Sequence, residues 1–133
     1  MHEWALAEGI IKSILNYLKE NNLNAPSEVV ISYGELQQID IDAFKFALNE
    51  LVKGTVLEKT RFILEEEKAV FKCRNCGNEW EFKEIKDSFS EDVSEAIHFV
   101  PELAHSFIKC PKCGSSDFEV VKGRGVTVKT LVF

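Results

Sequence analysis

Four cysteines are the residues of this chain best suited to bind a metal, and the chain has no others. They form two Cys-x-x-Cys pairs, Cys73 with Cys76 and Cys110 with Cys113. This spacing places both sulfurs of a pair on one side of a tight turn, so two pairs can supply four thiolates to one tetrahedral Zn²⁺. A glycine follows each pair and can adopt the positive φ that turns the chain away from the metal. The pattern predicts a structural zinc site.

The spacing also leaves other uses of the cysteines open. A disulfide framework would need an oxidising compartment. A thioredoxin-like redox pair would need a single Cys-x-x-Cys at a strand-to-helix junction. A zinc hydrolase would need water in place of one cysteine, because four thiolates leave no open position on the metal. The sequence shows no Ser-His-Asp set or carboxylate pair, so we expect a protein that is not an enzyme.

The N-terminal residues Met1, His2 and Glu3 form a second possible metal site. With the Met1 amine free, this amine, the backbone nitrogen of His2 and its imidazole Nδ1 would close fused five- and six-membered chelate rings. A fourth nitrogen or oxygen would complete a square-planar site, which suits Ni(II) or Cu(II) rather than Zn²⁺. From spacing alone, a disordered terminal histidine is the simpler interpretation.

The composition limits the classes of protein that fit. The 133 residues suffice for one domain, or for one domain with a small insert. A net charge of −6 argues against broad attraction to phosphates, so a zinc-ribbon module of nucleic-acid machinery is only the alternative function. Glu8 and Lys12 interrupt the apolar residues 4–18, so neither a membrane span nor a signal peptide is predicted. We expect a cytoplasmic protein whose cysteines stay reduced.

Hydrophobic periodicity predicts the elements that must position these residues. In chain order we expect a helix over 4–21, a strand over 28–36, a helix from Asp40 to Gly54, a strand over about 57–66, a ribbon of 70–73 and 79–82, a helix over 90–98, and a long strand over 118–131 with a bulge or turn at 123–125. Trp4 and Trp80 are expected in the core.

This order of elements predicts an α/β (α+β) fold. A small three-stranded mixed sheet would carry two helices on one face, and a Cys₄ zinc-ribbon-like domain would be inserted into it. The predicted limits are 1–67 and 116–133 for the α/β domain and 68–115 for the insert. The cysteine pairs are separated by the 33 residues 77–109, more than the roughly 15–20 of a compact site, so part of the insert must have its own structure.

Several segments together resemble the HypA family of hydrogenase nickel-insertion metallochaperones, nearly end to end. They are MHEWALA at 1–7, GEL at 34–36, FKCRNC at 71–76, CPKCG at 110–114 and VVKGRG at 120–125. The resemblance implies a nickel-binding α/β domain that carries a Cys₄ zinc domain. It also implies that the chain passes Ni(II) toward the large subunit of NiFe hydrogenase, aided by a HypB-type GTPase.

The resemblance assigns residues to each metal. It implies that His2, the Met1 amine and the backbone of Glu3 bind nickel, and that the four cysteines bind zinc. The long segment between the cysteine pairs is similar to that of the archaeal branch, which implies that His98 joins the nickel site when the GTPase is bound. A histidine between apolar residues is otherwise typical of packing. Metal binding by the Glu3 carboxylate, a homodimer and urease as a second client are left open.

Overall fold

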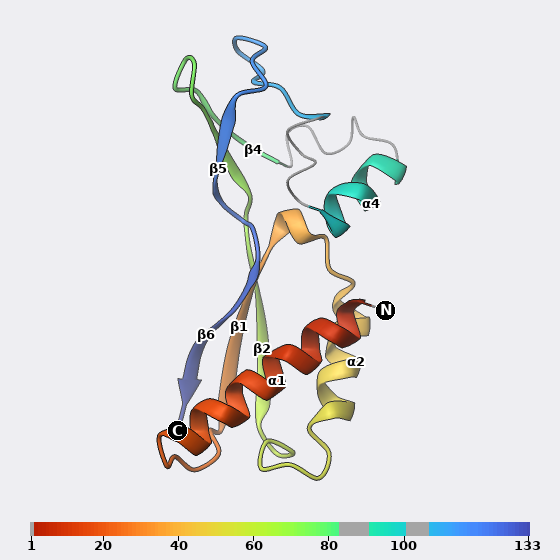
Figure 1. Ribbon diagram of the computed structural model, residues 1–133, viewed down its shortest axis with the longest axis vertical. Coiled ribbons are helices and arrows are strands. Elements are labelled where there is room, and N and C mark those ends of the chain that lie inside the picture. The colour runs from red at the N-terminus through yellow and green to blue at the C-terminus, as the bar shows by residue number, and fades with distance from the viewer. Residues whose placement is uncertain (1, 83–90, 101–106) are drawn as a thin grey trace. The chain divides into compact units, whose positions relative to one another are not determined.

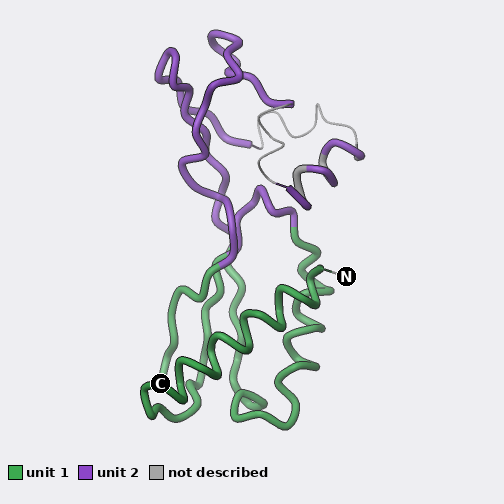
Figure 2. Tube along the Cα trace, in the orientation of Figure 1, with its two compact units in different colours: residues 1–32, 39–65, 127–133 green, residues 33–38, 66–126 purple. Residues whose placement is uncertain are grey.

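The computed structural model describes residues 2–82, 91–100 and 107–133 (Figure 1). The chain forms two compact units (Figure 2). Unit 1 comprises residues 1–32, 39–65 and 127–133, and unit 2 comprises residues 33–38 and 66–126. The domain limits of 1–67 with 116–133 and of 68–115 stay a prediction. No helix in the described ranges has the length and apolar character that crossing a membrane requires.

Two helices pack together in unit 1, as predicted. Helix α1 spans His2–Glu20 and helix α2 spans Ile41–Leu51. The first helix buries apolar residues at three-four spacing, which places them on one face: Ala7, Ile10, Ile11, Ile14 and Leu18. The second helix begins where Asp40 caps it, because the carboxylate accepts a 3.1 Å hydrogen bond from Ala43 N.

The chain also forms a three-stranded sheet with the strand order β2-β1-β6. The strands are β1 (Glu28–Gly34), β2 (Arg61–Glu67) and β6 (Val126–Val132). The central strand fully buries Val29 and Ile31, while α1 runs diagonally across the sheet (Figure 1). The predicted three-stranded sheet with two helices is thus confirmed. β2 starts later than expected because Leu57 lies in a turn. In this turn the Leu57 N–H donates a 3.1 Å hydrogen bond to Thr55 Oγ1.

Unit 2 contains a second three-stranded sheet with the order β4-β3-β5. The elements of this unit are the 3₁₀ helix η1 (Glu35–Gln37), β3 (Val70–Cys73), β4 (Glu79–Glu81), α4 (Glu91–Phe99) and β5 (Phe118–Lys122). Both pairings of β3 are antiparallel, and they place Phe71 opposite Trp80 and Cys73 opposite Phe118. The expected long strand over 118–131 is instead two strands in two sheets, separated near Gly123 and Gly125, which both have positive φ.

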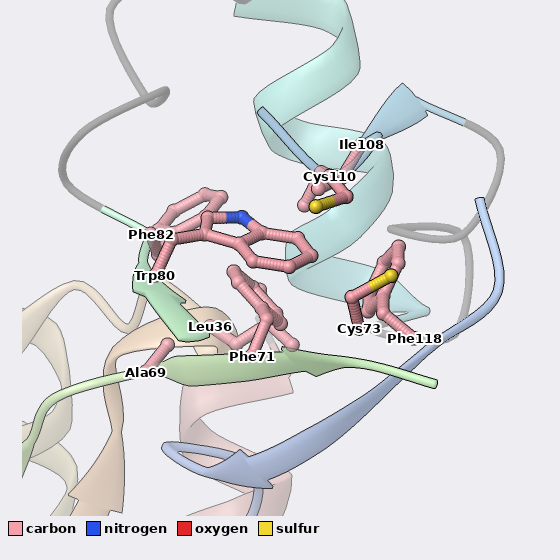
Figure 3. Packing of buried hydrophobic residues seen from close by; sticks show 9 residues of the cluster. All are labelled: Leu36, Ala69, Phe71, Cys73, Trp80, Phe82, Ile108, Cys110 and Phe118. Carbon is pink, nitrogen blue, oxygen red and sulfur yellow. The ribbon is translucent and has the colours of Figure 1, made fainter. Parts of the chain in front are cut away.

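A compact cluster of nine buried residues forms the core of unit 2 (Figure 3). Its members are Leu36, Ala69, Phe71, Cys73, Trp80, Phe82, Ile108, Cys110 and Phe118. The Phe71 ring is central, with its centroid 5.6 Å from that of Trp80 and 5.3 Å from that of Phe118. Trp80 is 4% exposed, as predicted for a core residue, whereas Trp4 is 42% exposed, so the prediction for Trp4 was wrong. Trp80 can therefore report on the packing of unit 2.

In unit 2, three chain segments cross with their backbones in direct contact, at Gly34, Gly123 and Ala69. Gly34 N donates a 2.7 Å hydrogen bond to Gly125 O, and Leu36 N donates a 3.0 Å bond to Gly123 O. A Cβ atom on Gly34 would lie 2.1 Å from Gly123 O, and one on Gly123 would lie 2.2 Å from the Ala69 Cα atom. Backbones can approach this closely only where side chains are absent.

Two carboxylates complete the same crossing. Glu35, which is 7% exposed, accepts a 3.0 Å hydrogen bond from Ala69 N. Glu67 accepts a 2.7 Å hydrogen bond from Gly123 N. An ionised acceptor makes a stronger hydrogen bond than a neutral one, so these carboxylates satisfy two backbone donors that the crossing strands leave without a ladder partner.

We predict that Gly34→Ala strongly destabilises the protein. The added methyl group must displace backbone atoms, an overpacking that costs about 1–3 kcal/mol or more. The matched control is Gly9→Ala, because a Cβ on this exposed glycine of α1 meets nothing within 4 Å. Alanine should stabilise the helix there by about 0.5–1 kcal/mol. Urea unfolding of both variants measures the difference, and equal stabilities would contradict the tight crossing.

Candidate metal centre

The four cysteine sulfurs converge on one point in unit 2. All four Sγ atoms lie within 4.8 Å of one another. The shortest contacts join the two pairs, at 3.5 Å from Cys73 to Cys113 and 3.7 Å from Cys76 to Cys110. Tetrahedral zinc with Zn–S bonds of about 2.3 Å separates its sulfurs by about 3.8 Å, whereas a disulfide bond is about 2.0 Å long. The cysteines are free, and their geometry fits Zn²⁺.

Each cysteine pair lies in a tight turn, which we call a knuckle. The first knuckle (residues 73–78) joins β3 to β4, and the second is formed by residues 110–115. Gly77 N donates a 3.0 Å hydrogen bond to Cys73 O, and Gly114 N donates a 2.8 Å bond to Cys110 O. Both glycines have a φ of 77°, as predicted for the residue that turns the chain away from a metal.

One sulfur of each knuckle faces the protein core and the other faces solvent. Cys73 and Cys110 are 1% and 2% exposed, and both belong to the cluster around Phe71 (Figure 3). Cys76 and Cys113 are exposed. With sulfur on all four corners, a zinc ion here would be closed to water and could act as a structural metal but not as a hydrolytic one.

The first knuckle is also attached to β5. Arg74 N donates a 3.0 Å hydrogen bond to Asp117 O, and its guanidinium reaches the Asp117 carboxylate at 3.0 Å and Phe118 O at 3.1 Å. The ion pair is exposed, so it contributes little by itself. The backbone contacts hold the first knuckle beside the strand that leads away from the second.

The second knuckle favours thiolates. Burial raises the pKa of Cys110, but hydrogen bonds from the backbone N–H groups of Cys113 and Lys112 and with the Cys76 and Asn78 side chains together lower the pKa to about 6. The Ser115 N–H and the Asn75 amide lower the pKa of Cys113. Since folding depresses the pKa of Cys110 below its ordinary value near 9, the resulting stabilisation is present above that value and is lost as the pH falls toward 6.

The pKa of Cys76, in the first knuckle, shows how unfavourable a further thiolate is beside the sulfurs of the second knuckle. The Asn78 N–H lowers the pKa of Cys76, but desolvation and the neighbouring sulfurs of Cys110, Cys113 and Cys73 together raise it to about 11. A Cys76 thiolate is therefore unfavourable at neutral pH unless a cation lies among the sulfurs. A bound divalent metal supplies that charge and makes the fourth thiolate favourable.

The residues predicted to bind nickel are described only in part. Met1 lies outside the described residues. His2 is the first residue of α1, with its side chain 36% exposed, and its Nε2 atom lies 3.9 Å from Oε1 of Glu3. The Glu3 side chain is 10% exposed. His2 and Glu3 are neighbours in the first turn of α1.

The structure does not test the expected role of His98. Its backbone belongs to α4 in unit 2, but its side chain lies outside the described part of the chain. His105 also lies outside it. The structure therefore brings the four cysteines together, and it leaves the assignment of Met1, His2, Glu3 and His98 to nickel as a prediction.

Two residues near the sulfurs were missed in the sequence. Asn75 Nδ2 lies 3.6 Å from Cys113 Sγ, and Asn78 Nδ2 lies 3.7 Å from Cys110 Sγ. The sequence feature that could have identified them is an amide side chain at Asn75, between the two cysteines of the first pair, and another at Asn78, directly after Gly77. Because the contacts cross between knuckles, local spacing could not show which sulfur each amide would reach.

Comparisons with known proteins point to one family. The chain matches, over residues 1–133, the family described as "Hydrogenase/urease nickel incorporation, metallochaperone, hypA". The hydrogenase maturation factor HypA of Pyrococcus furiosus is 51% identical over 132 residues, which cover 99% of this chain and 95% of that protein. The hydrogenase maturation factor HypA of Ignicoccus hospitalis is 34% identical over 125 residues, which cover 92% of this chain and 89% of that protein.

Solved structures share the fold. The solution structure of the Ni metallochaperone HypA from Helicobacter pylori matches with a TM-score of 0.62 at 18% sequence identity. The match covers 98% of this chain and 95% of that one. At this identity the similarity shows a shared fold and no more.

We predict that Cys73→Ser removes bound zinc and opens unit 2 while the helices of unit 1 persist. Ligation in such modules contributes on the order of 10–16 kcal/mol, which the small aromatic core cannot replace. In a Trp4→Phe background, emission from Trp80 should shift to longer wavelength while far-UV circular dichroism keeps most of its helical signal. Chelation of zinc from the unsubstituted cysteines should have the same effect. Simultaneous loss of both signals would show that the units do not unfold separately.

Proposed function

Because the chain belongs to the HypA family of hydrogenase and urease nickel-incorporation metallochaperones, we propose that it binds Ni(II) at its N-terminus and delivers it to a NiFe hydrogenase during maturation. The four-cysteine site has the donor set of structural zinc, and nickel is the cargo. The observation that carries this function is the match to the family over the whole of residues 1–133.

The proposed nickel ligands are the Met1 amine, the backbone nitrogens of His2 and Glu3, and the His2 imidazole. Nitrogen donors in a plane suit Ni(II). The start of α1 at His2 supports the proposal, because backbone nitrogens in the first turn can lose their protons to a metal without breaking intrahelical hydrogen bonds. The partial exposure of the His2 side chain leaves the site accessible to a protein that receives the metal.

Glu3 has a second proposed task besides its backbone nitrogen. Its largely buried carboxylate lies on the Nε2 side of the His2 ring, at 3.9 Å. A carboxylate near one ring nitrogen favours the proton there and so leaves Nδ1 free to bind metal. In this arrangement Glu3 orients the imidazole through its side chain, and the ligand set does not require its carboxylate.

The protein's other properties follow from this role. It transfers a metal and is not an enzyme, and its proposed partners are a HypB-type GTPase and the hydrogenase large subunit. His98 is proposed to join the nickel site when the GTPase is bound. Reduced, free cysteines suit the cytoplasm, which is the proposed location. A homodimer and delivery to urease are further possibilities that size measurements and urease activation can test.

We predict that His2→Ala abolishes Ni(II) binding and leaves one zinc per chain. Loss of the imidazole opens the six-membered chelate ring, so nickel affinity should fall at least a hundredfold in isothermal titration. His105→Ala is the control and should bind nickel as the unsubstituted protein does. Unchanged affinity in the His2 variant would refute the proposed nickel site.

A second prediction concerns the Met1 amine. Three extra glycines before Met1 move the amine too far along the chain to share adjacent chelate rings with the His2 imidazole, while every side chain stays in place. Nickel affinity should therefore fall nearly as far as in His2→Ala, and the absorption band of planar nickel should be lost. An authentic N-terminus generated by proteolysis of a longer leader provides the control. Normal nickel uptake by the extended protein would exclude the amine as a ligand.

A further inference from the structure

The two knuckles have the same backbone but different side chains. Cys73 N donates a 2.8 Å hydrogen bond to Asn78 O, and Cys110 N donates a 2.8 Å bond to Ser115 O. Asn78 and Ser115 therefore occupy equivalent positions, two residues after the last cysteine of each pair. Within the pairs, Asn75 stands where the second knuckle has Lys112. The knuckles therefore share these backbone hydrogen bonds and differ in the side chains at these two positions.

Both asparagines of the first knuckle reach the second. The Asn75 amide lies 3.6 Å from Cys113 Sγ, and the Asn78 amide lies 3.7 Å from Cys110 Sγ. Ser115, the counterpart of Asn78, uses its hydroxyl locally, because Oγ accepts a 3.0 Å hydrogen bond from Asp117 N. The amide N–H groups therefore point in one direction, from the first knuckle to the sulfurs of the second.

We propose that Asn75 and Asn78 are positioning residues of the zinc centre, which donate amide N–H groups to the two second-knuckle sulfurs and so set how fast zinc is released. The inference rests on the proposed zinc ligation by the four cysteines. An N–H donor stabilises a thiolate and restrains its direction, and such outer partners commonly change metal affinity by about 10–100-fold. The asparagines also join the knuckles directly, although 33 residues separate the pairs along the chain.

The exposed sulfurs offer an internal comparison. Cys76 and Cys113 each receive the backbone N–H two residues further on, from Asn78 and Ser115. Cys113 receives the Asn75 amide in addition. A thiolate whose lone pairs are engaged by donors attacks electrophiles more slowly, so Cys113 should react more slowly than Cys76 in the zinc-loaded protein.

Substitution of either asparagine by aspartate removes the hydrogen bond to sulfur while the packing of the side chain is kept. Asn75→Asp and Asn78→Asp keep the size, shape and carbonyl of the side chain but replace its N–H donor with a negative oxygen. Alanine variants remove the donor without adding charge. Ser116→Ala, at an exposed residue just beyond the second knuckle, is the matched control.

The experiment measures zinc release from the full-length, zinc-loaded chain to the chelator 4-(2-pyridylazo)resorcinol. Each alanine variant should release zinc about tenfold faster than the unsubstituted protein, and each aspartate variant faster still. Ser116→Ala should leave the rate unchanged. Far-UV circular dichroism and Trp80 emission before chelation establish that each variant is folded.

Mapping of cysteine alkylation tests the pairing of each amide with its sulfur. Short treatment with N-ethylmaleimide, followed by mass spectrometry, should show that Asn75→Asp accelerates modification of Cys113 relative to Cys76. Asn78→Asp should accelerate modification of Cys110 relative to Cys73. A role confined to folding would instead expose all four cysteines together, and that outcome would overturn the inference.

The outcomes for the two proposals are distinguishable. If the unsubstituted protein does not hold one zinc with four sulfur ligands by X-ray absorption, the proposed structural role of the cysteines fails. If it does, but both aspartate variants release zinc at the unsubstituted rate, only the positioning role of the asparagines fails.

Discussion

Four sulfur atoms lie within 4.8 Å of one another, and a cation among them offsets the repulsion between thiolates held so close together. Two of these sulfurs also belong to the core of unit 2, because Cys73 and Cys110 are buried in the cluster that surrounds Phe71. Among the described residues the cluster has nine buried members, and small modules with little apolar core commonly use a bound metal as well. Metal charge and aromatic packing therefore stabilise one and the same structure.

The two proposed metals need opposite environments. The zinc site is closed by four sulfurs and by backbone hydrogen bonds, which favours retention of the metal. The proposed nickel site lies at the start of helix α1, where the His2 side chain is partly exposed. A cargo that must be released suits the open site, and a metal that stabilises a fold suits the closed one.

The glycine crossing in unit 2 explains how a segment distant in sequence joins the zinc-containing core. Leu36, which is fully buried among the residues around Phe71, follows Gly34 by two positions. It can reach that core because Gly34 and Gly123 allow backbones to meet without intervening side chains. The buried Glu35 carboxylate then satisfies Ala69 N, so the crossing leaves this polar backbone group paired.

The sequence by itself determined the zinc site and the secondary structure around it. Two cysteines separated by two residues and followed by a glycine specify a knuckle, whatever the length of chain between the two pairs. Apolar residues at three-four spacing specify α1 and α2. Only the tertiary structure decided which distant residues meet. It divided the expected strand over 118–131 between two sheets, exposed Trp4 but buried Trp80, and aimed Asn75 and Asn78 at the opposite knuckle. Local rules describe neighbours along the chain, whereas these outcomes depend on strand pairing and packing between segments far apart in sequence.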